Sequence, residues 1–400
     1  MIHDRAIEEA ILAELDADGL AELSFRVGDV YPTTLRDSVG SLVQRNRLPA
    51  LVGRRLTLHR AEVISVCDED LPVPHPLDGD WRLEVPTRKD MCRRLRAASL
   101  TGEILLLGVP TIFREIVSEG ARVTLVDANT RLATSLMGGR FIIGDVSDLA
   151  PVVPACASVF ADPPWYPETI DQFVWYASES TLLGGHVFLS MPGLLTRPGI
   201  EAERSHLLHF AAKCGLRLRG IERRALRYES PPFERASLSA AGLPGFPRSW
   251  RHGDLAEFDK VSVTAQQRPA KRSRPRWIEH VVRGVSIRFR VRPEPIFNPK
   301  PILLGPSRVR LTVSARDPLI SLVDVWTSGN QIYRCDSPLR LARLAESFEE
   351  LGDGVAMIET DVGRKLLAHE RILVDQARSE LGRVVSTDFT RLEVRSPALP

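Results

Sequence analysis

Three aspartates in the middle of this 400-residue sequence each follow a short apolar segment. They are Asp127, Asp145 and Asp162, and the segments before them are typical of strands buried on both faces of a parallel sheet. The carboxyl ends of parallel strands lie at one edge of a sheet, so the three carboxylates are expected to share a site. There Asp127 could accept hydrogen bonds from the two hydroxyls of a ribose, and Asp145 could accept one from an exocyclic amino group.

The last of these segments leads into the run Asp162-Pro163-Pro164-Trp165-Tyr166. An amine on adenine or cytosine is a poor nucleophile because the ring delocalises its lone pair. If Asp162 and the carbonyl of Pro163 or Pro164 accept its two N–H bonds, the nitrogen is drawn toward a tetrahedral geometry and can attack a methyl donor. Two prolines stiffen the turn, and Trp165 or Tyr166 could stack on the base. The alternative is an ordinary turn, since Asp before Pro commonly starts one.

This run resembles the catalytic tetrapeptide of the S-adenosylmethionine-dependent amino methyltransferases. Those enzymes place an acid or amide, two prolines and an aromatic residue at the carboxyl end of a parallel strand. The resemblance implies a class I methyltransferase domain with S-adenosylmethionine as its cofactor, held by Asp127, Asp145 and the loop at Gly108. It implies transfer to an amino group of a nucleic acid base, in DNA or RNA, with N6 of adenine favoured.

The loop after the first apolar strand departs from that family. Methyltransferases of this fold usually carry a glycine-rich loop there, whereas Gly108 is followed here by Val109 and Pro110. Proline has no backbone N–H to offer a ligand, and valine adds bulk. A second hypothesis is therefore a binding or scaffold protein that keeps the fold without catalysis, and it predicts an occluded cofactor pocket around these two residues.

A second resemblance covers roughly residues 1 to 260 and concerns the order of the parts. A winged helix, an acidic linker, a segment such as Val85 to Arg94, a first strand ending in glycine and a later Asp-Pro-Pro are similar to the branched-chain polyamine synthases. That family transfers aminopropyl groups on the same fold. Its members carry acidic residues where this sequence has Val109-Pro110 and Trp165. We therefore expect shared ancestry, keep aminopropyl transfer as an alternative, and favour a base over a polyamine.

The expected fold class is α/β, with flanking domains on both sides of a Rossmann-like centre. Residues 67 to 80 are rich in Asp, Pro and Gly, and residues 266 to 276 are basic and broken by proline, which are the compositions of linkers. We assign a winged helix-turn-helix-like domain to 1–66, a linker and a basic helix to 67–98, the Rossmann-like class I methyltransferase domain to 99–265, the basic linker to 266–276, and a C-terminal α+β domain of unknown role to 277–400.

The N-terminal part combines helical and strand patterns. Residues 4 to 16 and those after Pro32 carry apolar side chains at helical spacing, while Leu48 to Leu58 indicates two short strands about Gly53. Helices followed by a small β-ribbon are typical of a winged helix. Its basic face either binds nucleic acid phosphates or faces solvent in a protein-docking or dimerisation module. The arginines concerned are Arg36, Arg45, Arg47, Arg54 and Arg55.

The C-terminal part begins with alternating patterns at Ile287 to Val291 and Val309 to Val313, which predict antiparallel strands. Residues 338 to 382 are mostly helical in pattern. The stretch from Lys271 to Arg292 carries eight basic residues against one acid and includes aromatic residues such as Phe289. Such a stretch can follow a phosphate backbone and stack bases, or it can be a solvated linker.

Composition says more about the cellular compartment of the protein than about the chemistry of its site. Lysine and arginine number 53 against 51 acidic residues, so net charge argues neither for nor against a nucleic acid partner. The five cysteines are scattered and form no Cys-x-x-Cys pair, which suits a reducing cytoplasm. The sequence lacks an apolar signal core and a run of 18 apolar residues, so neither export nor membrane insertion is expected. The histidines do not suggest a metal site.

Overall fold

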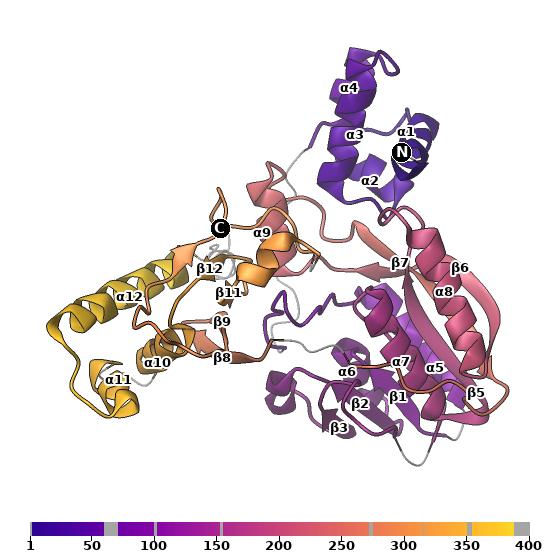
Figure 1. The fold of residues 1–400 in the computed structure, drawn as a ribbon. Helices are drawn as coiled ribbons and strands as arrows, with labels where there is room; N and C mark the ends of the chain where they lie inside the picture. Colours follow the sequence, from indigo (N-terminus) through magenta and orange to yellow (C-terminus); the bar gives the residue numbers. More distant parts are fainter. Residues whose placement is uncertain are drawn as a thin grey trace, which may run out of the picture.

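The structure is a computed structural model that describes residues 2–59, 71–99, 102–152, 155–271, 275–314, 316–349 and 354–387. Figure 1 shows a helical N-terminal unit, a central α/β domain, and a C-terminal domain of short strands and long helices. The central domain contacts both of the others, through Arg36 and the carbonyl of Ala241 on one side and through Arg131 and Glu279 on the other.

A seven-stranded sheet forms the centre of the α/β domain, with the strand order β3-β2-β1-β4-β5-β7-β6. The first five strands pair in parallel, while β7 is antiparallel to both β5 and β6. The order reverses between β1 and β4, so their carboxyl ends form the switch point at which such sheets bind ligands. The strands are β1 (Ile104–Leu107), β2 (Val123–Asp127), β3 (Arg140–Ile143), β4 (Cys156–Ala161), β5 (Thr181–Pro192), β6 (Leu216–Tyr228) and β7 (Arg251–Lys260).

Helices cover both faces of this sheet, which confirms the expected α/β class. Leu105 and Leu107 of β1 enter the apolar cluster under α7 and α8, while Ile104 and Leu106 enter the cluster under α5 and α6. Burial on both faces explains why these strands are continuous apolar runs in the sequence. The helices are α5 (Val85–Ser99), the basic helix expected there, α6 (Pro110–Ser118), α7 (Pro167–Glu179) and α8 (Ile200–Lys213), with α9 (Pro232–Ala240) before β7 and the 3₁₀ helix η1 (Thr130–Thr134) after β2.

The N-terminal unit is helical over its described residues, so the two strands predicted across Leu48 to Leu58 were wrong. Residues Ala50–Leu56 form α4, and the ribbon of a winged helix is not formed by them. The pattern indicates a turn at Gly53, whereas a Cβ on this residue would lie 2.3 Å from Cγ2 of Val43. Glycine therefore lets α4 pack closely on α3. The other helices are α1 (Ile2–Ala13), α2 (Leu20–Val27) and α3 (Pro32–Gln44).

The N-terminal helices share an apolar core with the α/β domain, to which they add Leu35, Val39 and Leu42. The α/β domain contributes Leu243 and Trp250 to the same cluster. Four of the five arginines expected to face phosphates contact the protein itself, which supports a docking role for this unit over a phosphate-binding one. These contacts run from Arg45 and Arg47 to Glu8, from Arg55 to the carbonyl of Leu15, and from Arg36 to the carbonyl of Ala241.

The C-terminal domain is a small antiparallel sheet with helices packed against it. The strand order is β10-β12-β11-β9-β8, and the long helices lie at the far end of the molecule from β6 (Figure 1). The helices expected within residues 338 to 382 are present. The elements are β8 (Trp277–Val282), β9 (Val285–Arg290), β10 (Ile302–Leu303), the 3₁₀ helix η2 (Pro318–Leu322), β11 (Val325–Thr327), β12 (Ile332–Arg334), α10 (Pro338–Glu349), α11 (Gly354–Val362) and α12 (Ala368–Thr387).

The strand predicted at Val309 to Val313 is absent. The side-chain amide of Asn330 donates to the carbonyls of Arg310 and Thr312, at 3.4 and 3.1 Å, and to the hydroxyl of Ser237 at 2.8 Å. A neighbouring strand would normally take those carbonyls. The segment therefore wraps around one buried side chain instead of joining the sheet.

Some described residues of the basic stretch from Lys271 to Arg292 have contacts within the protein. Phe289, one of the aromatic residues that could have stacked on bases, is fully buried in the core of the C-terminal domain. Arg292 pairs with Asp324 at 2.8 Å. Residues 272–274 lie outside the described part of the chain. The contacts that are described favour a structural role over a nucleic acid surface.

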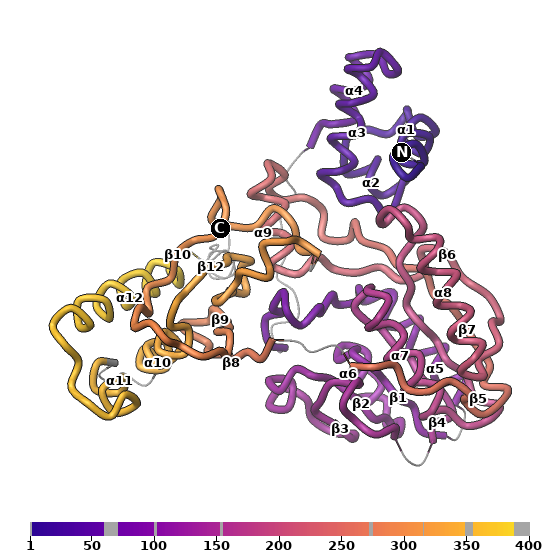
Figure 2. Tube along the Cα trace, viewed as in Figure 1, coloured from indigo at the N-terminus to yellow at the C-terminus, as the bar shows by residue number. Residues whose placement is uncertain are grey.

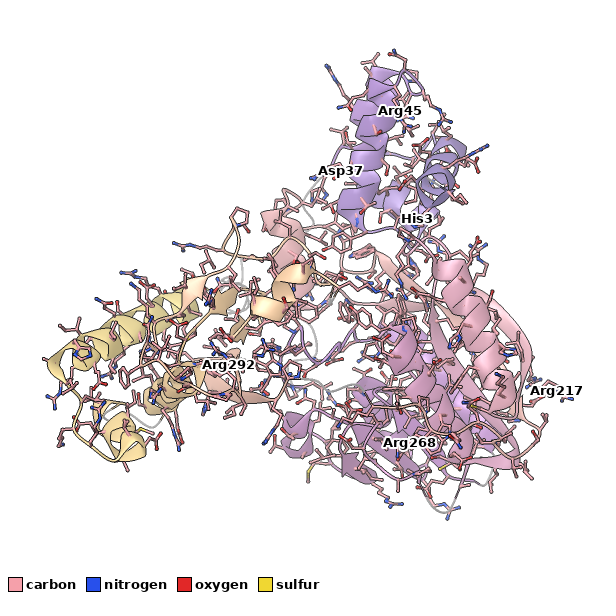
Figure 3. All side chains as sticks on the ribbon, viewed as in Figure 1. His3, Asp37, Arg45, Arg217, Arg268 and Arg292 are labelled. Carbon is pink, nitrogen blue, oxygen red and sulfur yellow. The ribbon has the colours of Figure 1, made fainter. Side chains whose placement is uncertain are left out.

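The predicted linker at residues 266 to 276 is bound to the α/β domain over its described residues. Arg268 donates to the carbonyl of Leu149 at 2.8 Å and lies over the ring of Trp175. Figure 3 shows Arg45, Arg217, Arg268 and Arg292 on separate parts of the molecule. These four arginines therefore do not form one basic face.

Helices that combine the length and the apolar character needed to cross a bilayer are not found in the described ranges. Clusters of three or more potential metal ligands are likewise missing from this part of the chain. Cys92, Cys156, Cys214 and Cys335 are buried free thiols, and Cys67 lies outside the described residues.

Substitution of Gly53 by alanine should destabilise the N-terminal unit by about 1–3 kcal/mol, because the new Cβ must displace Val43. Gly40 of α3 is the matched control, since a Cβ there meets nothing within 4 Å. Gly40→Ala should stabilise α3 by about 0.5–1 kcal/mol through helix propensity. Urea unfolding followed by circular dichroism measures both changes, and equal effects of the two variants would contradict the packing role of Gly53.

Candidate functional site

The predicted carboxylates meet at the carboxyl edge of the sheet. Leu107 of β1 pairs with Val126 on one side and with Ala161 on the other. Asp127, the last residue of β2, and Asp162, which directly follows β4, therefore flank Gly108. The strand register thus places two of the three predicted carboxylates at one edge of the sheet, while the roles of all three remain proposals.

Asp162 is held by two hydroxyl groups from the far half of the sheet. Its Oδ1 accepts hydrogen bonds from the hydroxyl of Ser190 on β5 and from the hydroxyl of Tyr228 on β6, the latter at 2.9 Å. Oδ2 accepts none from the described residues. Burial raises the pKa of Asp162 to about 7, although the two hydroxyl donors act to lower it and Asp80 adds a small increase. A carboxyl group with this pKa can exchange a proton at neutral pH.

Trp165 contacts Ser190 and Tyr228, the two residues that hold Asp162, instead of extending toward a ligand. Its indole Nε1 donates to the Ser190 hydroxyl at 3.2 Å, and its ring meets Tyr228 edge to face with centroids 5.7 Å apart. A Cβ on Gly253 would lie 2.8 Å from Cζ2 of Trp165, so glycine is required beneath the indole. These contacts disfavour the predicted role of Trp165 as a base-stacking residue.

The two carbonyl groups of the proline turn differ in whether they already accept a hydrogen bond. The carbonyl of Pro164 accepts the backbone N–H of Tyr166 at 2.7 Å, whereas the carbonyl of Pro163 has no donor among the described residues. Pro163 is therefore the better second acceptor for an amine. The ring of Tyr166 lies under the guanidinium of Arg316, which is 5.8 Å from the ring centroid and comes from the C-terminal domain.

Asp127 occupies a crowded acidic environment. Its Oδ1 accepts the backbone N–H of Asn129 at 2.8 Å. Burial raises the pKa of Asp127 to about 7, and the carboxylates of Asp80 and Asp78 add to the increase, against Asn129 and Arg82. An anion that is this costly to bury is suited to a ligand that donates hydrogen bonds to it or carries positive charge.

The loop after β1 combines one permissive residue with two restrictive ones. Gly108 has φ +72°, and a Cβ there would lie 3.3 Å from the carbonyl oxygen of Asp162. Glycine is thus required at this turn. Val109 is buried and Pro110 is the first residue of α6, as the sequence predicts. The turn therefore offers fewer backbone N–H donors than a glycine-rich loop.

Asp145 lies two residues beyond β3 and caps a turn. Its Oδ1 accepts the backbone N–H of Ser147 at 2.8 Å, and its carbonyl accepts that of Asp148. This geometry is that of an ordinary turn-starting aspartate. The predicted contact of Asp145 with an adenine amino group has no further support from its surroundings.

Sequence reasoning missed Asp80, which belongs to the predicted linker. The described residues from Leu71 onward lie between the C-terminal domain and the sheet (Figure 2). Gly79, with φ +64°, packs on the turn, where a Cβ would lie 2.9 Å from Cγ of Pro164. Asp80 follows it and acts on both Asp127 and Asp162. The sequence Asp78-Gly79-Asp80 was the available signal, but its composition is equally typical of a solvated linker.

A comparison with solved structures finds proteins with a similar architecture. The branched-chain polyamine synthase from Thermus thermophilus has a TM-score of 0.52 and 17% identity, covering 67% of this chain and 91% of that one. A mutein of the same synthase also has a TM-score of 0.52, with 16% identity and 68% and 90% coverage. The α/β domain has the class I methyltransferase fold. A weaker likeness, with a TM-score of 0.30, is to the N-methyltransferase NodS from Bradyrhizobium japonicum, at 11% identity over 45% of this chain and 99% of that one.

The sequence itself gives no relative, because no protein-family model matches it and no curated protein matches it either. At 16–17% identity the likeness to the synthase shows the fold alone. The class I methyltransferase fold fixes where a ligand site belongs, at the switch point beside Gly108. It leaves the reaction to be argued from the residues found there.

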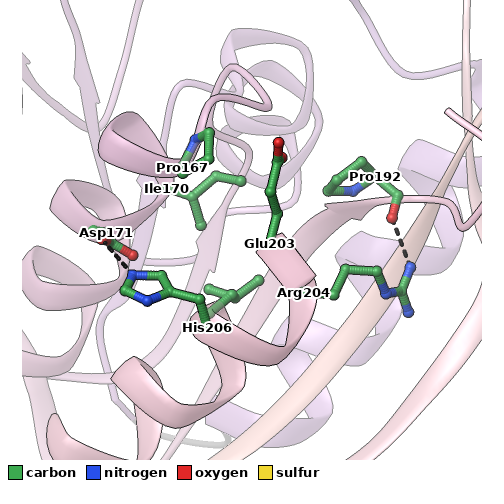
Figure 4. A pocket seen from close by; sticks show the side chains of 8 residues that line it. Pro167, Ile170, Asp171, Pro192, Glu203, Arg204 and His206 are labelled. Carbon is green, nitrogen blue, oxygen red and sulfur yellow. Dashed lines mark hydrogen bonds and ion pairs between the residues drawn. The ribbon is translucent and has the colours of Figure 1, made fainter. Parts of the chain in front are cut away.

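The surface of the α/β domain has a depression that lies apart from the candidate site. It encloses about 260 Å³, part of it open to solvent, between α7 and α8 (Figure 4). His206 contacts Asp171 there at 3.0 Å, and Arg204 donates to the carbonyl of Pro192 at 2.6 Å. Neither Asp127 nor Asp162 lines it, so we do not include it in the candidate site.

Asp162→Asn should stabilise the protein at alkaline pH. The pKa of Asp162 rises from 3.8 to about 7 on folding, so the folded state holds the proton more tightly. The burial cost is absent below about pH 4 and complete above about pH 7, and the free energy of unfolding falls as pH rises through that window. Asparagine keeps the acceptor for Ser190 and Tyr228 without the charge, so the variant should gain about 1–3 kcal/mol at pH 8.

Urea unfolding at pH 4 and pH 8 checks this prediction, and the difference between wild type and variant should vanish at the lower pH. Asp259→Asn serves as the control of opposite sign. The Asp259 carboxylate pairs with Arg217 at 2.9 Å, which lowers its pKa. This control should show no gain at pH 8. A gain of the same size in both variants would contradict the burial argument.

Proposed function

We propose that this protein alkylates an amine with an S-adenosyl sulfonium cofactor, and that Asp162 holds the amine. The observation that carries the proposal is the anchoring of Asp162 through Oδ1 alone, which leaves Oδ2 beside the switch point of the sheet. Oδ2 and the carbonyl of Pro163 would accept N–H bonds of the amine and orient its lone pair. With its pKa near 7, Asp162 would also take the proton that the nitrogen loses as it gains its new bond to carbon.

The residues present fit such a cofactor at its nucleoside end. Asp127 is a buried carboxylate that needs donors, and the two hydroxyls of a ribose are such donors. Gly108 keeps the backbone free of a side chain at the switch point. When bound, an S-adenosyl sulfonium supplies an electrophilic carbon and a neutral thioether leaving group. S-adenosylmethionine is the cofactor that the class I methyltransferase fold implies.

The acceptor that these residues favour is an aliphatic polyamine, whose reacting nitrogen is neutral while its other nitrogens are protonated. Asp80 acts on both Asp127 and Asp162 and raises the cost of ionising each of these carboxyl groups. A protonated amine group would relieve that cost, whereas a neutral base would not. The synthase that shares this fold was crystallised with N4-aminopropylspermidine and 5'-methylthioadenosine, which makes a polyamine a reasonable first acceptor to test.

The turn after β1 bears on whether the bound cofactor carries a carboxylate. Pro110 lacks an N–H and Val109 is buried, so little backbone is available to receive a carboxylate. The carboxylate of S-adenosylmethionine would in addition lie near an acidic site. Decarboxylated S-adenosylmethionine has no such group, so we propose aminopropyl transfer as the favoured reaction and methyl transfer as the alternative.

A base amine in DNA or RNA is the second candidate acceptor, and Tyr166 is the observation in its favour. Its aromatic ring directly follows the proline turn and lies beneath Arg316, an arrangement on which a base could stack. Trp165 does not add to that surface.

We propose that the protein is cytoplasmic. The partners to be tested are a nucleic acid, another protein and a second copy of this chain.

The experiment measures product formation by the full chain. Four mixtures combine S-adenosylmethionine or its decarboxylated form with spermidine or an adenine-containing oligonucleotide, and mass spectrometry identifies the product. We expect an aminopropylated polyamine. Asp162→Ala should lower kcat/KM by about 10²–10⁴-fold, and Tyr228→Phe by about tenfold, while the Kd for cofactor stays within about threefold.

Asp171→Asn is the matched control because Asp171 is a carboxylate outside the site, paired with His206. It should retain wild-type kinetics. Methylated oligonucleotide as the main product would replace the polyamine proposal by the base amine. Failure to bind either cofactor at millimolar concentration would favour the scaffold hypothesis, and full activity of Asp162→Ala would remove Asp162 from its role.

A further inference from the structure

The acidic character of the site depends on a segment with no strand or helix of its own. Residues 72 to 82 are turns and irregular structure, and they carry Asp80 to the edge of the sheet. Asp80 itself pairs with Arg82 at 3.3 Å, within the same segment. A segment of this kind keeps one position only if other parts of the protein hold it.

The C-terminal domain supplies two such contacts. His75 is fully buried, and its Nε2 lies 2.9 Å from the carbonyl oxygen of Trp326. Burial places the pKa of His75 well below its usual value, so the ring is neutral. The guanidinium of Arg288 on β9 contacts Asp78 at 2.5 Å. The side chains of Arg288 and Asp78 are only 13% and 12% exposed, so this ion pair is largely removed from water.

Arg288 is also tied to the cofactor side of the sheet. Its guanidinium contacts Glu279 at 3.3 Å, and Glu279 contacts Arg131 at 3.2 Å. Arg131 belongs to η1, which begins three residues after Asp127. A continuous chain of charges therefore runs from the end of β2, through the C-terminal domain, to the segment that carries Asp80.

We propose that Arg288 is a positioning residue for the amine site: by holding Asp78, it keeps Asp80 beside Asp162 and Asp127 and so sets the affinity for a cationic acceptor. The inference rests on the proposed function, since it concerns the acceptor of that same site. The geometry that supports it is the run from Asp78, through Gly79 packed on Pro164, to Asp80. Only Gly79 separates Asp78, the residue that Arg288 holds, from the carboxylate of Asp80.

The charged and hydrogen-bonding groups around the two reporter carboxyls are defined, which makes the effect of losing Arg288 specific. Asp162 faces the hydroxyls of Ser190 and Tyr228 and the carboxylate of Asp80. Asp127 faces the backbone N–H of Asn129 together with Asp78, Asp80 and Arg82. Removal of Arg288 releases Asp78, the residue that leads into Gly79 and Asp80, so Asp80 is no longer held in place and its negative charge acts less on the site, while Asp162 and Asp127 are retained.

Isothermal titration of the full chain with spermidine, a linear polycation, tests the inference. Asp80→Asn should weaken spermidine binding about tenfold, and Arg288→Ala should weaken it by a similar factor. The double variant should bind about as weakly as either single one, because both changes remove the same carboxylate from the site. Arg288→Lys should recover part of the affinity. A purely structural loss would not reproduce this dependence on Asp80.

Two controls separate positioning from unfolding. Arg340→Ala breaks an ion pair of 3.0 Å with Glu294 inside the C-terminal domain, away from the segment, and should leave spermidine binding unchanged. The Kd for 5'-methylthioadenosine should stay within about threefold in Arg288→Ala, which shows that the nucleoside end of the site is intact.

The outcomes distinguish the inference from the proposed function. If wild type does not bind spermidine, the polyamine acceptor is wrong and the inference falls with it. If wild type binds spermidine and Arg288→Ala binds it equally well, the positioning role alone is wrong. A double variant about 100-fold weaker than wild type would show two independent effects, and this would also overturn the inference.

Discussion

The burial of the Asp162 carboxyl group, without a cation beside it among the described residues, is the constraint on which the site depends. Ser190 and Tyr228 supply hydrogen bonds but no charge, so the group keeps a raised pKa. A lysine or arginine in either place would form an ion pair and hold the carboxyl ionised. The two hydroxyls come from β5 and β6, and Gly253 on the intervening β7 leaves room for Trp165 beneath them. Residues on β5 and β6 thus set the environment, and with it the pKa, of Asp162 at the end of β4.

The sequence predicted the parts of the fold that obey local rules. The apolar segments before Asp127, Asp145 and Asp162 were expected to be strands, and they form β2, β3 and β4, because burial on both faces demands continuous apolar residues. Asp127 and Asp162 followed from the same reasoning. β7 was not predicted, since Arg251 to Lys260 contains charged residues that pair with other elements: Arg251 contacts Glu234, and Lys260 donates to buried oxygens such as the carbonyl of Cys214.

The features that escaped prediction all depend on a distant partner. Gly53 has the appearance of a turn until Val43 is placed against it, and Val309 to Val313 has the alternation of a strand until Asn330 takes its carbonyls. Asp80 has the composition of a linker until Arg288 and Trp326 fix the residues before it. Periodicity records which side of an element is apolar, and it holds no information about which residues of another segment contact that element.

The contact between His75 and Trp326 joins residues 251 positions apart, and it has a consequence for synthesis of the protein. Domains generally fold in order as a chain leaves the ribosome, at about 5–20 residues per second. His75 and Asp80 emerge before the first strand of the sheet, whereas Trp326 emerges only after the last one. For several seconds the nascent sheet is therefore complete while His75 still lacks its partner in the C-terminal domain, and the chain passes through a stage that resembles the class I methyltransferase fold without its cover.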